Sequence, residues 1–157
     1  MDEIFEPVGH HIYLHAIVAV EFKEALIDPS WAGDLFTQVA GILSATNNTP
    51  LVVSGTEDHM HFLINMSPHY SMDGLITEVK THAKNWVDRK RLTNVPFGWQ
   101  EGYGAFTISM SQKDTLVEFL KHQEEYHQKV SFLEEFREIL HENQLEFEEE
   151  DLFHLPH

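Results

Sequence analysis

The chain has 157 residues, of which 42% are hydrophobic, so it can form one domain with a core and is not a disordered protein. It has no cysteine, which excludes disulfides, zinc–thiolate sites and a cysteine nucleophile. No apolar run approaches the roughly 18 residues of a membrane span, and the start Met1-Asp2-Glu3 is acidic where a signal peptide is basic, so a cytoplasmic protein without membrane contacts is expected.

The net charge of −16 argues against a nucleic-acid partner, but the charge is unevenly distributed. Glu134 to Asp151 carries nine acids and one base, whereas Gly74 to Lys113 carries three acids and six bases. The middle of the chain is therefore locally basic. This pattern fits equally a solvated helix end, whose cations suit the helix dipole, and a contact with phosphate.

The first half of the chain predicts three strands and one helix. Ile12 to Val20 is a near-continuous apolar run, typical of a buried strand. Asp28 starts a helix whose apolar residues recur at helical spacing to about Ala45. Leu51 to Thr56 and His59 to Met66 follow as strands, and the two residues between them predict a hairpin.

The second half predicts three helices and a fourth strand. Ser71 caps a helix that should end before Pro96, and a glycine-rich stretch follows. The remaining elements are the strand Ala105 to Met110, a helix from Ser111 to about Lys129, and a last helix from Phe132 to His141 after a Ser131 cap.

The order β-α-β-β-α-β predicts an α+β fold, a ferredoxin-like or RRM-like antiparallel sheet with two helices on one face. The extra C-terminal helices are additions to it. Strands one and three are then the central pair, and the opposite sheet face is free to hold a site. We expect one domain over residues 1–143 and an acidic tail over residues 144–157.

Two histidines separated by one residue stand on the third predicted strand. His59 and His61 project to one face, while Met60 and Phe62 point to the other, into a core. Paired imidazoles on a rigid strand are half of a divalent-metal site. Taken alone, the residues favour two surface histidines on an exposed sheet face.

Five segments form a pattern that runs in order along nearly the whole chain. They are Tyr13-Leu14-His15-Ala16-Ile17-Val18, Gly55 to Ile64 with the two histidines, Ser71 to Trp86, Trp99-Gln100-Glu101-Gly102-Tyr103-Gly104-Ala105-Phe106, and His122-Gln123-Glu124-Glu125-Tyr126-His127. In these segments the chain resembles the single-tyrosine HUH transposases, which mobilise insertion sequences and process repeat-associated palindromes as single-stranded DNA.

The resemblance implies DNA strand cleavage and joining, that is DNA recombination, at the foot of a hairpin. In this family a tyrosine on the third helix forms a 5′-phosphotyrosine, assisted by Mg²⁺ or Mn²⁺. The implied metal ligands are His59, His61 and Gln123, and the implied assembly is a homodimer that binds single-stranded or hairpin DNA. On one continuous helix, positions 119 and 123 would share a face.

The sequence departs from the family at the nucleophile, because position 119 is phenylalanine. Phe119 has no oxygen to attack a phosphate, which favours a protein that has lost strand cleavage. Tyr126 lies two helical turns further on, about 10 Å away on a continuous helix, so it is a poor substitute. His122 and His127 are expected to be exposed, and His15 to be packed or at the surface.

The basic residues of the second predicted helix are the candidates for contacts with DNA phosphates. They are Lys80, Lys84, Arg89, Lys90 and Arg91. Because the chain is acidic and lacks the tyrosine, a domesticated, non-catalytic regulator that binds palindromic DNA or RNA is the alternative function. A metal-dependent hydrolase that uses water is a weaker third, with Glu57 and Asp58 near the histidines.

Overall fold

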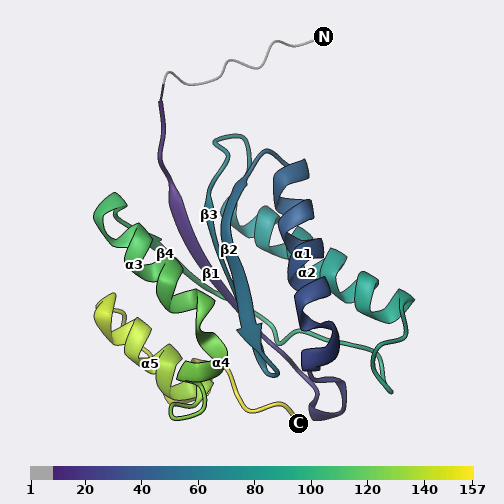
Figure 1. Cartoon of the computed structure of the whole chain (residues 1–157). Coiled ribbons are helices and arrows are strands. Elements are labelled where there is room, and N and C mark those ends of the chain that lie inside the picture. The colour runs from purple at the N-terminus through teal and green to yellow at the C-terminus, as the bar shows by residue number, and fades with distance from the viewer. Residues whose placement is uncertain (1–8) are drawn as a thin grey trace.

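A computed structural model of the chain describes residues 9–157 (Figure 1). Residues 1–8 lie outside the described part. They include the acidic start that argued against a signal peptide and the first residues of the expected domain. Within residues 9–157, no helix is both long enough and apolar enough to cross a membrane.

Four strands and five α-helices alternate along the described chain. The strands are β1 (Tyr13–Ala19), β2 (Thr49–Thr56), β3 (His59–Asn65) and β4 (Gly104–Ile108). The helices are α1 (Pro29–Ala45), α2 (Met72–Arg89), α3 (Met110–Lys121), α4 (Gln123–Tyr126) and α5 (Phe132–Glu142). Short 3₁₀ turns lie at Lys23–Ala25 and Glu149–Asp151.

The strands form one antiparallel sheet in the order β2-β3-β1-β4, which confirms β1 and β3 as the central pair. The α+β, ferredoxin-like fold predicted from the element order is therefore correct. In the β1–β3 register, Ile17 lies opposite His61 and Ala19 opposite His59. Both histidines thus lie in the middle of the sheet.

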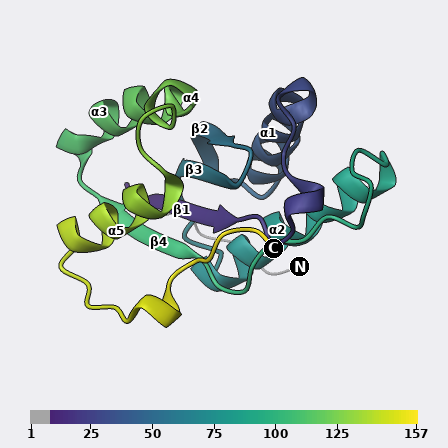
Figure 2. The same cartoon turned by 90° about the horizontal axis from the view of Figure 1, so that it is seen from below.

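One sheet face is covered by α1 and α2 (Figure 2). Met60 and Phe62 point to this side and are fully buried, as their alternation with the histidines predicts. The predicted starts of α1 and α2 are also in place. The Asp28 carboxylate accepts from Ser30 N at 2.9 Å, and the Ser71 hydroxyl oxygen accepts from Gly74 N at 3.0 Å.

The other face of the sheet is covered by α3, α4 and α5 (Figure 2). The predicted continuous helix from Ser111 to Lys129 is wrong, because α3 ends at Lys121 and α4 begins at Gln123. His122 between them has φ −114° and ψ 33°, outside the α-helical region. The break turns the Gln123 side chain into the protein, where it is only 2% exposed.

The predicted fourth strand, Ala105 to Met110, begins one residue after the start of β4 and runs two residues past its end. Ser109 ends it as the N-cap of α3, and its backbone N–H donates to the side chain of Gln112 at 3.3 Å. A strand and a helix cannot share these residues, so β4 stops at Ile108.

The end of the acidic tail packs against the domain. Phe153 is 8% exposed and joins Phe132 and Phe136 in an apolar cluster beneath α5. The amide of Gln100 donates to His154 O at 2.6 Å and its oxygen accepts from His154 N at 3.0 Å. Phe153 and His154 therefore hold the end of the chain against α5 and against Gln100.

Candidate metal centre

His59 and His61 are buried rather than on an exposed sheet face, because the C-terminal helices cover them. Both side chains have no exposed surface, and their ring centroids are 4.9 Å apart with planes at 83°. The alternative of two surface histidines is thus wrong. A buried imidazole needs a partner for each ring nitrogen, so the surroundings decide what the pair can do.

Gln123, the third expected ligand, lies at the same place. Its Oε1 is 2.8 Å from His59 Nε2 and 3.0 Å from His127 Nε2. Its amide nitrogen donates to Glu135 Oε2 at 2.9 Å, and this fixes the orientation of the amide. The sequence-predicted residues His59, His61 and Gln123 are therefore brought together.

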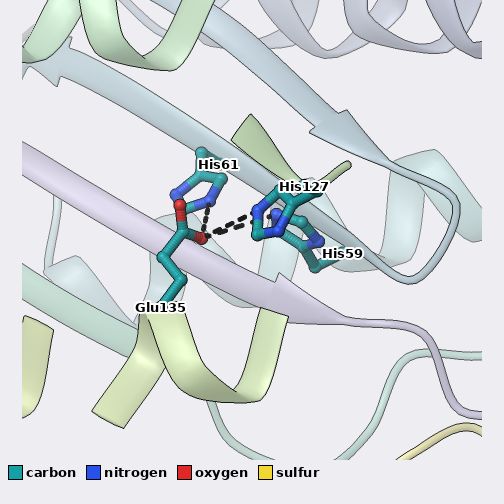
Figure 3. Close-up of side chains that lie close together, drawn as sticks. All are labelled: His59, His61, His127 and Glu135. Carbon is teal, nitrogen blue, oxygen red and sulfur yellow. Dashed lines mark hydrogen bonds and ion pairs between the residues drawn. The ribbon is translucent and has the colours of Figure 1, made fainter. Parts of the chain in front are cut away.

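Glu135 on α5 points its carboxylate into the centre of this group (Figure 3). Its Oε1 lies 2.9 Å from His61 Nε2, 3.3 Å from His127 Nε2 and 3.7 Å from His59 Nε2. One ligand atom from each of these four residues lies within 4.8 Å of every other. We call His59, His61, His127 and Glu135 the four-residue cluster.

Two members of the four-residue cluster were missed in the sequence. His127 was expected to be exposed, yet its side chain is 8% exposed, because α4 ends against the sheet. Glu135 is 2% exposed and lies between Phe132 and Phe136 on the buried face of α5. The sequence carried one signal for Glu135, because a carboxylate on the apolar stripe of a helix is buried only when it has a partner.

The outer nitrogens of the three imidazoles are also engaged. His59 Nδ1 donates to Asp58 Oδ1 at 2.8 Å, and His127 Nδ1 donates to Val130 O at 2.7 Å. His61 Nδ1 lies 2.8 Å from Nε2 of His15, which is buried beside it. These bonds fix each ring so that its Nε2 faces Glu135.

Burial and charge act against each other in this group. Burial alone would raise the pKa of Glu135, but contacts with His127, His61 and Gln123 outweigh it and hold the pKa far below its usual range. Burial lowers the pKa of His61, and it lowers the pKa of His15 to about 3. Burial also opposes the charge on His127, but the Glu135 carboxylate raises its pKa overall. The contacts therefore favour the charged form of Glu135, and burial favours the neutral form of His15.

Aromatic side chains close the site. The Phe132 ring stacks on His59 with centroids 4.1 Å apart and planes at 9°. Phe136 packs so closely over β4 that a Cβ on Gly104 would lie 2.7 Å from its ring. A cavity of about 400 Å³ lies beside the site and is lined by Asp58, His127 and Phe132, among others.

Phe119, at the expected nucleophile position, packs among apolar side chains next to Leu120, Tyr13 and Leu63. The centroid of its ring is 4.8 Å from that of Tyr126, and the Tyr126 ring is 5.0 Å from His127. The expected separation of about 10 Å assumed a continuous helix. The helix is not continuous but breaks at His122, so the distance of about 10 Å does not apply and Tyr126 lies beside Phe119.

The basic residues of α2 divide into two groups. Lys80 Nζ donates to Gln100 O and Gly102 O, both at 2.9 Å, and Lys84 Nζ donates to Phe97 O at 2.6 Å. These two side chains hold the glycine-rich loop. The other three expected DNA contacts, at the end of α2, are exposed: Arg89, Lys90 and Arg91.

The fold and the paired histidines are those of a transposase-like protein. The family model of IS200-like transposases matches residues 9–123, which is most of the chain. The chain belongs to this family. The match ends at Gln123, so His127 and Glu135 lie beyond the shared region.

Two solved structures have the same fold. A transposase-like protein of Deinococcus radiodurans R1 is 12% identical with a TM-score of 0.59, over 78% of this chain and 98% of that one. A REP-associated tyrosine transposase bound to a REP hairpin is 13% identical with a TM-score of 0.57, over 83% of this chain and 76% of that one. No curated protein matches the chain.

The donor atoms fit a divalent metal ion. Three imidazole nitrogens, a carboxylate oxygen and the oxygen of Gln123 converge on one buried point. Nitrogen, carboxylate and amide donors are all used by metal sites in proteins. The His–Glu cluster could therefore hold a metal ion.

Proposed function

We propose that this chain binds single-stranded DNA hairpins but does not cleave them through a phosphotyrosine at position 119. The observation that carries the proposal is Phe119, an oxygen-free ring at the position where the family resemblance implies the tyrosine nucleophile. The family membership supports DNA as the partner. A related fold occurs in a transposase bound to a REP hairpin, which supports hairpins as the form of DNA.

The surroundings of the histidines also favour binding without cleavage. The acidic helix α5 lies over them, with Glu134, Glu138 and Glu142 at exposed positions. Carboxylates repel phosphate, so this face is unfavourable for DNA. The exposed cations Arg89, Lys90 and Arg91 are the better candidates for phosphate contacts.

The proposal keeps a divalent ion at the histidines and does not depend on which ion binds there. The family resemblance implies Mg²⁺ or Mn²⁺ on His59, His61 and Gln123, and the donors of these residues converge. A bound ion in such a site polarises and orients a phosphate. Glu135 now lies between the same donors, so a phosphate reaches an ion there only after α5 moves.

Two measurements test this function. In the first, fluorescence anisotropy compares a labelled DNA hairpin with a linear strand of the same composition, and we expect tighter binding of the hairpin. In the second, hairpin DNA is incubated with the protein and Mn²⁺, and a denaturing gel is examined for a covalent protein–DNA band. Equal affinity for both DNAs contradicts hairpin recognition, and a covalent band contradicts loss of cleavage.

The second candidate is an active enzyme that uses Tyr126, favoured by the contact between the Tyr126 and Phe119 rings. Burial and the carboxylates around it raise the pKa of Tyr126, and a raised pKa makes the phenol a weaker nucleophile. If the gel shows a band, Tyr126→Phe should abolish it and Tyr103→Phe should not. Tyr103 is the matched control because its hydroxyl donates to Asp73 at 2.8 Å, away from the histidines.

A non-catalytic role as a palindrome-binding regulator follows if the hairpin binds and no band forms. The resemblance also implies a homodimer. Sedimentation of the free protein and of its hairpin complex tests that assembly, and a monomer in both contradicts it.

A further inference from the structure

The four-residue cluster differs from the ligand set that the family resemblance implies. That set is two histidines and a glutamine, which is open and suits Mg²⁺ or Mn²⁺. Here His127 and Glu135 add an imidazole and a carboxylate from a part of the chain beyond the family match. The added donors change both the number of ligands and the kind of ion that they favour.

The acceptors around His59 and His127 outnumber the N–H groups that two neutral imidazoles can donate. His59 Nδ1 faces the Asp58 carboxylate and its Nε2 faces Gln123 Oε1. His127 Nδ1 faces Val130 O and its Nε2 faces the same Gln123 oxygen. A neutral imidazole has only one N–H, so it cannot donate to both of its acceptors.

Glu135 adds to the shortage of donors, because its carboxylate oxygens also only accept hydrogen bonds. Its Oε1 lies at 2.9, 3.3 and 3.7 Å from three Nε2 atoms, and its Oε2 accepts from the Gln123 amide. Lone pairs of nitrogen and oxygen thus face one buried centre. Either extra protons or a metal ion must supply positive charge at that centre.

The spacing of the donors fits a metal ion. Zinc bonds of about 2.0–2.1 Å in a tetrahedron separate neighbouring ligand atoms by about 3.3 Å. The three distances from Glu135 Oε1 lie around this value. The Nδ1 bonds to Asp58, Val130 and His15 are the outer contacts that orient metal-binding imidazoles.

We propose that His59, His61, His127 and Glu135 form a closed site for Zn²⁺, with Gln123 Oε1 as the available fifth donor. Three imidazoles and a carboxylate favour Zn²⁺ over Mg²⁺, which prefers oxygen donors and retains water. The ion ties α4 and α5 to the central strand β3. Since protein atoms saturate it, no coordination position remains for a scissile phosphate, and its role is structural.

The first test uses the full chain after removal of metal by a chelator, without DNA. ZnCl₂ should bind with one ion per chain and raise the melting temperature. CoCl₂ should give the intense visible absorption of four- or five-coordinate Co²⁺, and Zn²⁺ should displace it. No binding, or the weak spectrum of six-coordinate Co²⁺, overturns the proposal. If no ion binds, protons alone supply the positive charge. If the spectrum is that of six-coordinate Co²⁺, the ion lies in an open site.

The second test separates this ligand set from the one that the resemblance implies. Glu135→Gln and His127→Ala should each weaken Zn²⁺ binding at least about 10-fold. The matched controls are Glu138→Gln and His141→Ala, both at exposed positions of α5, and these should bind as the unchanged chain does. Unchanged affinity in Glu135→Gln and His127→Ala overturns the proposal. Because no DNA is present, this result is independent of hairpin binding.

Discussion

The Glu135 carboxylate lies 2.9 Å from Nε2 of His61, although 74 residues separate the two in the chain. This contact joins α5 to the central strand of the sheet. The family match ends at Gln123, so His61 lies inside the matched region and Glu135 lies beyond it. The C-terminal helices are thus part of the site, and their packing can be tested through stability.

Phe132→Ala should lower the free energy of unfolding by about 3 kcal/mol, the usual cost of removing a buried phenylalanine. The ring is 5% exposed, stacks on His59 and contacts Phe136 and Phe153. Urea denaturation of metal-free protein measures the loss. Leu155→Ala is the control, since this residue is 67% exposed and should change stability by less than about 0.5 kcal/mol. Equal stability of the two variants would mean that α5 is not docked.

The fold could be predicted from the sequence because strand alternation and helix caps depend only on residues that are close together in the chain. Period-two alternation around Met60 and Phe62 fixed which side of β3 is buried against the helices, and the caps at Asp28, Ser71 and Ser131 marked three helix starts. The break after Lys121 could not be read in this way. It depends on burying the Gln123 amide against His59 and Glu135, which are distant in sequence.

The candidate site was predictable to the extent that it resembles the family. His59, His61 and Gln123 could be named, and the structure brings them together. His127 and Glu135 could not be named, because their roles depend on how α4 and α5 fold back over the sheet. His127 gives no local signal that distinguishes it from its solvated neighbours, and the one local signal for Glu135 is its position on the apolar stripe of α5.

Gln100→Ala should loosen the end of the chain. The Gln100 side chain donates to Val20 O at 3.0 Å and makes two hydrogen bonds with His154. Removing it leaves the buried carbonyl of Val20 and the partly buried backbone groups of His154 without this partner, at a cost of about 1–3 kcal/mol. Limited proteolysis should then cleave the segment after Asp151 faster, and mass spectrometry would locate the cut. Gln128→Ala, at an exposed position, is the control. An unchanged cleavage rate would mean that the tail is not held by Gln100.

Lys80→Ala and Lys90→Ala should affect different properties. Lys80 donates to two loop carbonyls, so its loss should lower the free energy of unfolding by about 1 kcal/mol. Lys90 is exposed, with Nζ 5.8 Å from the Trp86 ring, so its loss should weaken hairpin binding with little change in stability.

The salt dependence of binding distinguishes these roles. For Lys90→Ala, the slope of log affinity against log salt concentration should fall by about 1, as expected for one lost phosphate contact. For Lys80→Ala, the slope should stay unchanged. A reduced slope for Lys80→Ala would show that its ammonium group leaves the loop to contact DNA.

Asp88→Asn should reveal a pH-dependent contribution to stability. The Asp88 carboxylate accepts from Phe97 N at 2.8 Å and from Lys84 Nζ at 2.7 Å. Burial alone would raise the pKa of Asp88, but these two bonds outweigh it and hold the pKa below its usual value. The folded state therefore favours the charged carboxylate. Its contribution is complete above the unfolded pKa of about 3.9 and is lost as the pH falls through the lower folded value.

The unchanged chain should therefore exceed Asp88→Asn in stability by about 1 kcal/mol at pH 7, since the carboxylate is partly exposed. The difference should shrink as the pH is lowered below about 4. Urea denaturation at a series of pH values measures it. Asp114→Asn is the matched control, because its side chain is 94% exposed and should change stability little at any pH. A difference that is constant from pH 7 to pH 3 would assign the effect to side-chain shape rather than to the carboxylate charge.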